Sequence, residues 1–303
     1  MPINYIGSKK KLLHILKYIL SNYTNLKPSD GELVKKRIPK FADLMSGTGI
    51  VSDYFSNYYQ VISNDIEKYS SCISQALLKC EYSDKLKEII AELNELEGEE
   101  GLITKNYSPS DQNIFNRMFF TVDNARKADE MRRVIDEKYG KDEITKSEYY
   151  FLLASLIESL DKVANTTSIY GAYLKEFKKS AIAGFYLNPI HTKTELYSKH
   201  QVFNRDINDM LDYKYDIVYL DPPYNQRQYG SNYHVLNFIY EYDPEIEIYG
   251  KTGLLKNSFK SKFCNTRLVD MEFSRIIHDL KCKYILVSYN NEGLLSSDEL
   301  QSI

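Results

Sequence analysis

Residues 221–224 read Asp-Pro-Pro-Tyr and end an apolar run. Neither Pro222 nor Pro223 can donate a backbone hydrogen bond, so a strand formed by the run must stop there. The Asp221 carboxylate and the Pro222 carbonyl can together accept both hydrogens of one amino group. The Tyr224 ring can lie flat against a planar ring. The motif therefore indicates a site for a planar amino group, and the structural alternative is a Pro-Pro turn in which Tyr224 only packs.

A second motif, "DLMSGTG" at residues 43–49, runs from an apolar stretch into a glycine turn. Gly47 and Gly49 let the backbone approach a ligand closely, and a following helix would offer free N–H groups. Asp65 lies 22 residues after Asp43, at a spacing where a carboxylate commonly accepts hydrogen bonds from ribose hydroxyls. Together these residues indicate an adenosine-containing cofactor. The missing third glycine argues against a dinucleotide, and a plain tight turn is the alternative.

Two further stretches carry polar groups. In "NYIGSKKKLL", residues 4–13, a bend at Gly7 precedes Lys9 and a predicted helix. A cation there opposes the helix dipole and hints at another use, although a basic surface helix also fits. Asp206 in "FNRDIND" is expected to cap a helical turn. In a cofactor cleft it could instead accept a hydrogen bond from an adenine amino group.

The elements that must position these residues follow from the apolar pattern. Near-continuous apolar runs at 39–49, 60–70, 215–224 and 283–293 predict strands covered on both faces. Helical patterns at 10–20, 50–57, 68–80 and 270–281 alternate with them, which predicts a doubly wound α/β sheet. Residues 81–200 are long, charged and mostly helical in pattern. We expect a discontinuous catalytic domain of residues 1–80 and 201–303, with 81–200 inserted.

Composition limits the partners and the compartment. The chain has 303 residues and a net charge of −3, so no overall attraction to polyanions is expected. The stretch 251–267 nevertheless carries five basic residues and no acid, which suits either phosphates or a solvated face. The four cysteines form no zinc spacing with the five histidines, so we predict no metal site and reduced thiols in a cytoplasmic protein. No apolar run reaches the roughly 18 residues of a membrane span.

These motifs, in this order, resemble amino-methyltransferases that use S-adenosylmethionine, specifically the Dam-like adenine-N6 DNA methyltransferases of the D12, or alpha, class. The stretch "NQRQYGSNYH" after the Asp-Pro-Pro-Tyr motif resembles the restriction-modification branch. The resemblance implies a Rossmann-like methyltransferase sheet with a mostly helical target-recognition lobe at 81–200. It implies a catalytic group made of Asp221, Pro222, Pro223 and Tyr224. The cofactor-binding residues that it implies are Tyr5, Gly7, Lys9, Asp43, Gly47, Gly49, Asp65 and Asp206.

The same resemblance implies a reaction and its partners. A methyl group would pass to N6 of an adenine flipped out of double-stranded DNA, with Tyr224 stacked on the base. A cognate restriction endonuclease is the expected partner. Expected DNA contacts are Lys10, Arg227, Gln228, Lys260 and Lys262, whereas Arg126, Lys127, Arg132 and Arg133 either grip phosphates or form ion pairs along a helix.

Other readings remain open at this level. Cytosine-C5 chemistry is disfavoured because it needs a cysteine nucleophile, usually in a Pro-Cys pair, and the chain has no such pair. An amino group in RNA or in a protein glutamine is an alternative substrate. A catalytically inactive DNA-binding homologue is the alternative class. Such enzymes usually continue for a further strand pair beyond residue 293, so we expect a sheet truncated at its C-terminal end.

Overall fold

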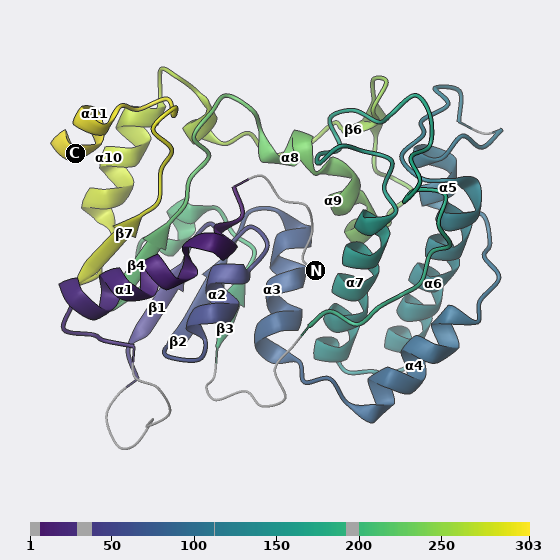
Figure 1. Cartoon of the computed structure of the whole chain (residues 1–303), viewed down its shortest axis with the longest axis horizontal. Coiled ribbons are helices and arrows are strands. Elements are labelled where there is room, and N and C mark those ends of the chain that lie inside the picture. Colours follow the sequence, from purple (N-terminus) through teal and green to yellow (C-terminus); the bar gives the residue numbers. More distant parts are fainter. Residues whose placement is uncertain (1–6, 29–37, 112, 192–199) are drawn as a thin grey trace. The chain divides into compact units, whose positions relative to one another are not determined.

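The computed structural model describes residues 7–28, 38–111, 113–191 and 200–303, which form two compact units (Figure 1). The sheet unit contains the described residues of 7–74, 196–228 and 259–303. The helical unit contains those of 75–195 and 229–258. The boundary between Ser74 and Gln75 lies inside helix α3 (Lys68–Lys79).

A parallel five-stranded sheet forms the centre of the sheet unit. Its strands are β1 (Lys40–Asp43), β2 (Gln60–Asn64), β3 (Gln201–Phe203), β4 (Ile217–Leu220) and β7 (Tyr284–Val287), in the order β3-β2-β1-β4-β7. Central strand β1 pairs with β2 on one side and with β4 on the other. The strand order reverses between β1 and β4. In open α/β sheets, ligands bind beyond the carboxyl ends of the strands at such a switch point.

Helices cover both faces of the sheet. Successive strand residues point to opposite faces, so Ala42 and Val218 pack with Phe273 of helix α10. The ring of Phe41 stacks on Phe55 of helix α2 at 4.6 Å on the other face. This packing explains the nearly continuous apolar runs and confirms the predicted Rossmann-like α/β architecture. The helices of the unit besides α3 are η1 (Lys9–Leu12), α1 (Leu13–Tyr23), α2 (Ile50–Phe55), η2 (Ile207–Met210), η3 (Lys262–Cys264), α10 (Val269–Asp279) and α11 (Ser297–Ser302).

The two edge strands differ from the sequence expectation. Strand β7 lies within the run predicted to be covered on both faces, but its residues are half-buried or exposed because it borders the described sheet. Strand β3 was not predicted. It is only three residues long, and its first residue, Gln201, is exposed. A strand this short at an edge carries too little apolar pattern to be recognised.

The helical unit contains α4 (Asp84–Asn94), α5 (Leu102–Tyr107), α6 (Val122–Gly140), α7 (Lys146–Lys162), α8 (Tyr229–Asn232) and α9 (His234–Glu241). A hairpin of β5 (Ile248–Tyr249) and β6 (Leu254–Leu255) completes it. Residues 229–258, which the sequence pattern placed with the catalytic domain, belong to this unit. Arg132 of α6 explains the packing, because its guanidinium donates to the carbonyls of Ile239 and Tyr240.

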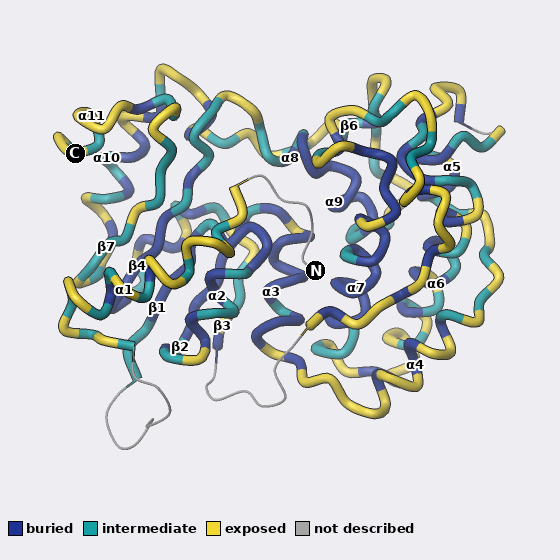
Figure 2. Tube along the Cα trace, viewed as in Figure 1, coloured by how far each residue is buried: buried dark blue, intermediate teal, exposed yellow. Residues whose placement is uncertain are grey.

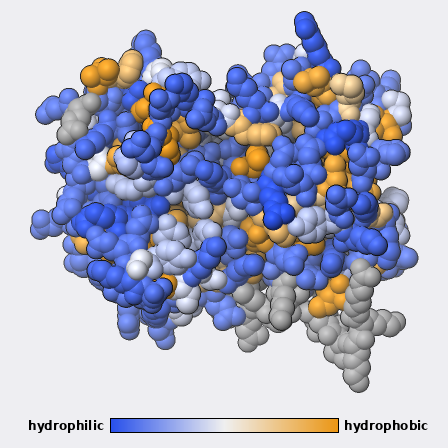
Figure 3. Space-filling model, turned by 180° about the vertical axis from the view of Figure 1, so that it is seen from behind, coloured by the Kyte–Doolittle hydropathy of each residue, from blue (hydrophilic) through white to orange (hydrophobic). Residues whose placement is uncertain are grey.

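Burial follows this organisation. Figure 2 shows strands β1, β2 and β4 and much of helix α7 as buried, with the outer side of α4 exposed. Hydrophilic side chains dominate the face drawn in Figure 3, and apolar side chains form small patches on it. Among the described helices, none combines the length and the apolar character needed to cross a membrane.

Candidate active site

The glycine turn after β1 forms one side of the candidate site. Gly47 and Gly49 have φ angles of 52° and 72°, which L residues with a Cβ adopt reluctantly. Helix α2 starts directly after Gly49. The turn is held by Asp65, whose Oδ2 accepts the Gly47 N–H at 2.7 Å. The sequence motif is therefore a strand-turn-helix junction, as its glycines predict.

Asp43 is a buried carboxylate that the fold leaves partly unsatisfied. Its Oδ2 accepts a hydrogen bond from the Ser52 hydroxyl at 2.8 Å. Its Oδ1 is buried without a hydrogen-bond partner among the described residues. The pKa of Asp43 is raised to about 7, chiefly by burial and with a smaller contribution from the charges of Asp221 and Asp65, while the Ser52 hydrogen bond opposes the rise. Such a group favours a cationic ligand, which would lower the free energy of its ionised form.

Two more acids follow neighbouring strands. Asp65, after β2, accepts backbone N–H groups of Gly47 and Glu67, and burial raises its pKa to about 6. Asp206 caps η2 and accepts the Asn208 N–H at 2.9 Å, as its sequence position predicts. Because parallel strands end at one edge of a sheet, these acids lie at the edge that also carries Asp221.

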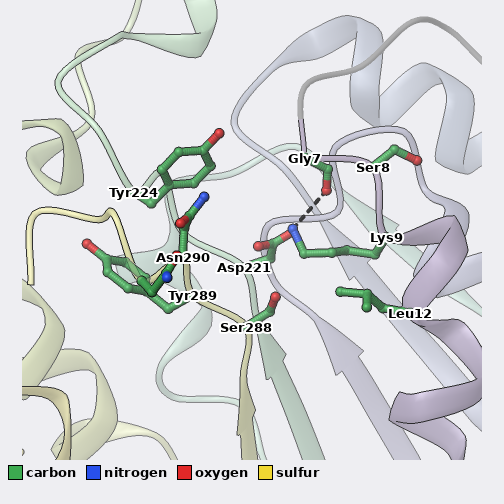
Figure 4. Close-up of a pocket in the computed structure, with 10 residues that line it drawn as sticks. Gly7, Ser8, Lys9, Leu12, Asp221, Tyr224, Ser288, Tyr289 and Asn290 are labelled. Atoms are coloured by element: carbon green, nitrogen blue, oxygen red, sulfur yellow. Dashed lines mark hydrogen bonds and ion pairs between the residues drawn. The ribbon is translucent and has the colours of Figure 1, made fainter. Parts of the chain in front are cut away.

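Asp221 follows β4 and meets Lys9 directly (Figure 4). The Lys9 Nζ lies 2.7 Å from Asp221 Oδ2 and donates to the Gly7 carbonyl at 2.8 Å. Burial raises the pKa of Asp221, and the adjacent Lys9 ammonium opposes that rise. Asp221 Oδ1 and the Pro222 carbonyl have no hydrogen-bond partner within the described chain. The corner thus carries two acceptors that the described residues leave unpaired; Asp221 lines the pocket described next, whereas Pro222 is buried and is not part of its described lining.

A pocket of about 480 Å³ opens at this corner (Figure 4). Its lining joins the N-terminal bend, including Gly7 and Lys9, to Asp221 and Tyr224. The segment after β7 supplies the remaining wall, which consists of Ser288, Tyr289, Asn290 and Asn291. The sequence showed two asparagines ending an apolar run, but no role was predicted for them. Their position after a parallel strand was the available signal.

The segment after β7 is tied to the Asp-Pro-Pro-Tyr corner by backbone hydrogen bonds. The Ser288 N–H donates to the Leu220 carbonyl at 2.9 Å, and the Leu294 N–H donates to the Tyr224 carbonyl at 2.9 Å. These two bonds fix the corner from both ends. The described lining of the pocket does not include Asp43, Gly47 or Gly49. They are linked to Asp221 through the pairing of β1 with β4 and through the charge of Asp43.

The residues predicted to contact DNA have varied surroundings. Lys10, Arg227 and Lys260 are exposed. The Gln228 amide is engaged in the fold, since it donates to the Ser261 carbonyl and accepts the Ser261 N–H. Lys262 lies 3.4 Å from Glu272. Tyr5 lies outside the described residues.

Arg126, Arg132 and Arg133 of α6 form ion pairs along and beside the helix, whereas Lys127 donates to the Asn94 carbonyl. Arg133 lies 2.7 Å from Glu137 and 2.8 Å from Glu99. Arg132 pairs with Asp136, four residues further along the helix. These contacts match the ion-pairing alternative for Arg132 and Arg133.

The whole chain matches one protein family. The model for the D12 class N6 adenine-specific DNA methyltransferases covers residues 5–303. The type II methyltransferase M.NlaIII of Neisseria lactamica is 42% identical over 305 residues, covering 99% of this chain and 87% of that protein. M.CviAII of Paramecium bursaria Chlorella virus 1 is 40% identical over 306 residues, with the same two coverages. M.FokI of Planomicrobium okeanokoites is 38% identical over 314 residues, 99% of this chain and 46% of that protein.

The chain therefore belongs to the D12 class N6 adenine-specific DNA methyltransferases. The family predicted from the sequence motifs is confirmed, and so are the Rossmann-like fold and the enzyme class. The relatives bear the names of type II DNA methyltransferases and modification methylases.

Proposed function

We propose that this enzyme transfers the methyl group of S-adenosylmethionine to N6 of an adenine flipped out of duplex DNA. We further propose that it is the modification enzyme of a restriction-modification system with a cognate endonuclease. The observation that carries the proposal is the pocket in which Asp221 and Tyr224 face the Lys9 bend. Membership of an adenine-specific DNA methyltransferase family supports adenine as the target base and DNA as the substrate.

The acids at the sheet edge suit this cofactor. S-adenosylmethionine carries a sulfonium and an ammonium charge, and it supplies an electrophilic methyl group when bound. The buried, unpartnered Asp43 Oδ1 and the raised pKa values of Asp43 and Asp65 fit a cationic ligand with ribose hydroxyls. The glycine turn at Gly47 leaves room for it. Gly7 and Lys9, with Gly49 and Asp206, are the other residues of the described chain that we assign to its binding.

Asp221 and Pro222 would act on the target base. The lone pair of an adenine amino group is delocalised into the ring, so the nitrogen is a poor nucleophile. Asp221 Oδ1 and the Pro222 carbonyl would accept its two hydrogens and favour a pyramidal nitrogen. The same oxygens stabilise the positive charge that develops on that nitrogen. Pro223 would hold the corner rigid, and Tyr224 would stack on the ring and orient it.

Lys9 favours the ionised form of Asp221, which this role uses. An ammonium 2.7 Å from a carboxylate favours its charged state. Lys10, Arg227, Gln228, Lys260 and Lys262 remain our proposed DNA contacts of the sheet unit. We assign target recognition to the helical unit, with 229–258 added to the inserted residues.

Sequencing with detection of modified bases tests the proposal. The chain is expressed in a host without adenine methylation, and Asp221→Ala is expressed in parallel. We expect N6-methyladenine within one short recurring sequence in the first DNA and none in the second. Unmodified DNA from cells that contain the folded wild-type protein would refute the proposal. Methyl groups found in RNA or protein, and not in DNA, would show that the substrate is RNA or protein.

A further inference from the structure

A buried arginine, Arg117, ties helix α5 to the turn of the β5–β6 hairpin, two elements that lie at one end of the helical unit (Figure 1). Only 4% of Arg117 is exposed, and its guanidinium donates to the carbonyls of Gly250, Lys251 and Asn106 at 3.0 to 3.1 Å. No carboxylate pairs with it in the described part of the chain. Its positive charge is therefore held beneath the surface without an acidic partner. We call residues 113–116 and the hairpin turn 250–253 the tip.

The hairpin turn directs its carbonyls inward. Besides the two carbonyls held by Arg117, the Gly253 carbonyl accepts the Tyr107 hydroxyl at 2.7 Å. The Thr252 carbonyl lies 2.8 Å from His234 Nε2. The N–H of a trans peptide points opposite to its C=O, so the N–H groups of Lys251 and Thr252 face outward. Neither N–H has a hydrogen-bond partner among the described residues.

The turn thus offers solvent a cation and two backbone donors. The Lys251 side chain is exposed and has no ion-pair partner in the described structure. Lys256, on the same hairpin, differs because its ammonium lies 2.6 Å from Glu247. Outward backbone N–H groups beside a lysine are a suitable set of donors for a phosphate.

Apolar side chains project from the other half of the tip. Ile114 is 90% exposed and Phe115 is 45% exposed. The Arg117 guanidinium lies 4.7 Å from the centre of the Phe115 ring. Asn113 fixes the loop, because its Oδ1 accepts the Phe115 N–H and its Nδ2 donates to the Ser108 carbonyl. Ile114 and Phe115 are thus adjacent apolar side chains that the braced loop presents to solvent together.

We propose that the tip enters duplex DNA, with Ile114 and Phe115 as the wedge and the Lys251 turn on a neighbouring phosphate. This proposal rests on the proposed function. Flipping a base requires a few kcal/mol of unstacking, and proteins that unstack DNA commonly insert apolar side chains between base steps. The positive charges of Arg117 and Lys251 lie beside Ile114 and Phe115. They favour a polyanion such as DNA, and not an uncharged protein surface, as the partner of the tip. The side chains of Ile114 and Phe115 would fill the gap in the base stack that forms when the adenine is flipped out.

DNA unwinding measures the wedge independently of methyl transfer. Closed circular, unmethylated plasmid is relaxed by a topoisomerase in the presence of saturating protein, and the change in linking number per bound protein is read from the topoisomers. We expect the wild type to unwind DNA, Ile114→Ser with Phe115→Ser to lose at least half of that unwinding, and Ile114→Leu to keep it. Met271→Ala is the control, because Met271 is 65% exposed in the sheet unit.

Salt dependence measures the phosphate contact. We expect Lys251→Ala to lower the slope of log affinity against log salt by about one, the value for one lost phosphate contact. Lys256→Ala should leave the slope unchanged, because that ammonium is already paired. Equal slopes for wild type and Lys251→Ala would remove the turn from the interface.

The outcomes separate this inference from the proposed function. If the Ile114→Ser, Phe115→Ser double variant unwinds DNA and methylates it as the wild type does, the wedge is refuted and the proposed function is unaffected. If unwinding depends on Ile114 but the wild-type protein does not methylate adenine, the wedge is supported and the proposed function is refuted. We expect both properties in the wild type and an about tenfold slower methylation in the double variant, with cofactor affinity unchanged.

Discussion

Replacing Asp43 by asparagine should increase the stability of the cofactor-free protein relative to the wild type as the pH rises from 5 to 8. The carboxyl group is buried, and its pKa is raised from 3.8 to about 7. Its proton is therefore bound more tightly in the folded chain than in the unfolded chain. Stability is then highest below the unfolded pKa and falls as the pH rises through about 7. Asparagine does not titrate and removes this dependence.

The size of the effect follows from the shift. Each pKa unit corresponds to about 1.4 kcal/mol, and between pH 5 and about 7 the folded carboxyl stays protonated while the unfolded one is ionised. The stability of Asp43→Asn relative to the wild type should therefore rise by about 3 kcal/mol between pH 5 and pH 8. The buried amide of asparagine has a desolvation cost of its own, about 1–3 kcal/mol. That cost does not change with pH and cancels in the comparison.

Thermal unfolding at pH 5 and pH 8 provides the assay. For a sheet unit of roughly 150 residues, about 3 kcal/mol corresponds to a change of about 6–12 °C in the difference between the two Tm values. Asp270→Asn is the control, because Asp270 is exposed and its carboxylate is hydrated in both states. A Tm difference between Asp43→Asn and the wild type that is the same at both pH values would refute the reasoning. The variant should also bind S-adenosylmethionine at least tenfold more weakly, because one charge-assisted interaction is lost.

Three further outcomes are expected. Removing the ammonium in Lys9→Ala should shift the acidic limb of the methylation pH profile upward, because Lys9 opposes the rise in the pKa of Asp221; Lys9→Arg should restore it. Tyr224→Phe should keep methylation within severalfold, whereas Tyr224→Ala should slow it about 5- to 150-fold through loss of base stacking worth about 1–3 kcal/mol. In urea unfolding of the helical unit, Gly253→Ala should destabilise more than Gly250→Ala by about 1–3 kcal/mol, since both have positive φ but only the first Cβ meets a buried ring, at 2.9 Å. The argument for Lys9 fails if the pH profile of Lys9→Ala is unshifted. The argument for Tyr224 fails if both tyrosine variants methylate at the same rate, and the argument for Gly253 fails if both alanine variants are destabilised equally.

The sheet and much of the site were predictable because each depends on local signals. Apolar runs fix which residues enter a doubly covered sheet, and parallel strands bring their carboxyl ends to one edge, which places Asp43, Asp65 and Asp221 together. The Lys9–Asp221 ion pair was not predictable, since 212 residues separate its members. Their meeting depends on where the N-terminal bend packs. In the sequence, the one indication of this ion pair was the unfavourable position of Lys9, a cation, at the start of a helix.

Two features escaped the sequence for other physical reasons. The wall of Ser288 to Asn291 depends on the pairing of β7 beside β4, and sequence alone does not specify which strands are neighbours. The placement of residues 229–258 in the helical unit depends on inward-facing contacts, such as those of Arg117 and Arg132 with backbone carbonyls. A backbone carbonyl has no sequence signature, so such contacts become visible only in three dimensions.

The most direct test of the central claim, that Asp221 holds an adenine amino group for methylation, separates binding from transfer. Purified wild type and Asp221→Ala are given tritiated S-adenosylmethionine and unmethylated duplex DNA, and the labelled nucleosides are identified while cofactor binding is measured in parallel. We predict label in N6-methyldeoxyadenosine for the wild type, and no transfer by Asp221→Ala although its cofactor affinity stays within severalfold. Undiminished transfer by Asp221→Ala, or label in cytosine, would contradict the account.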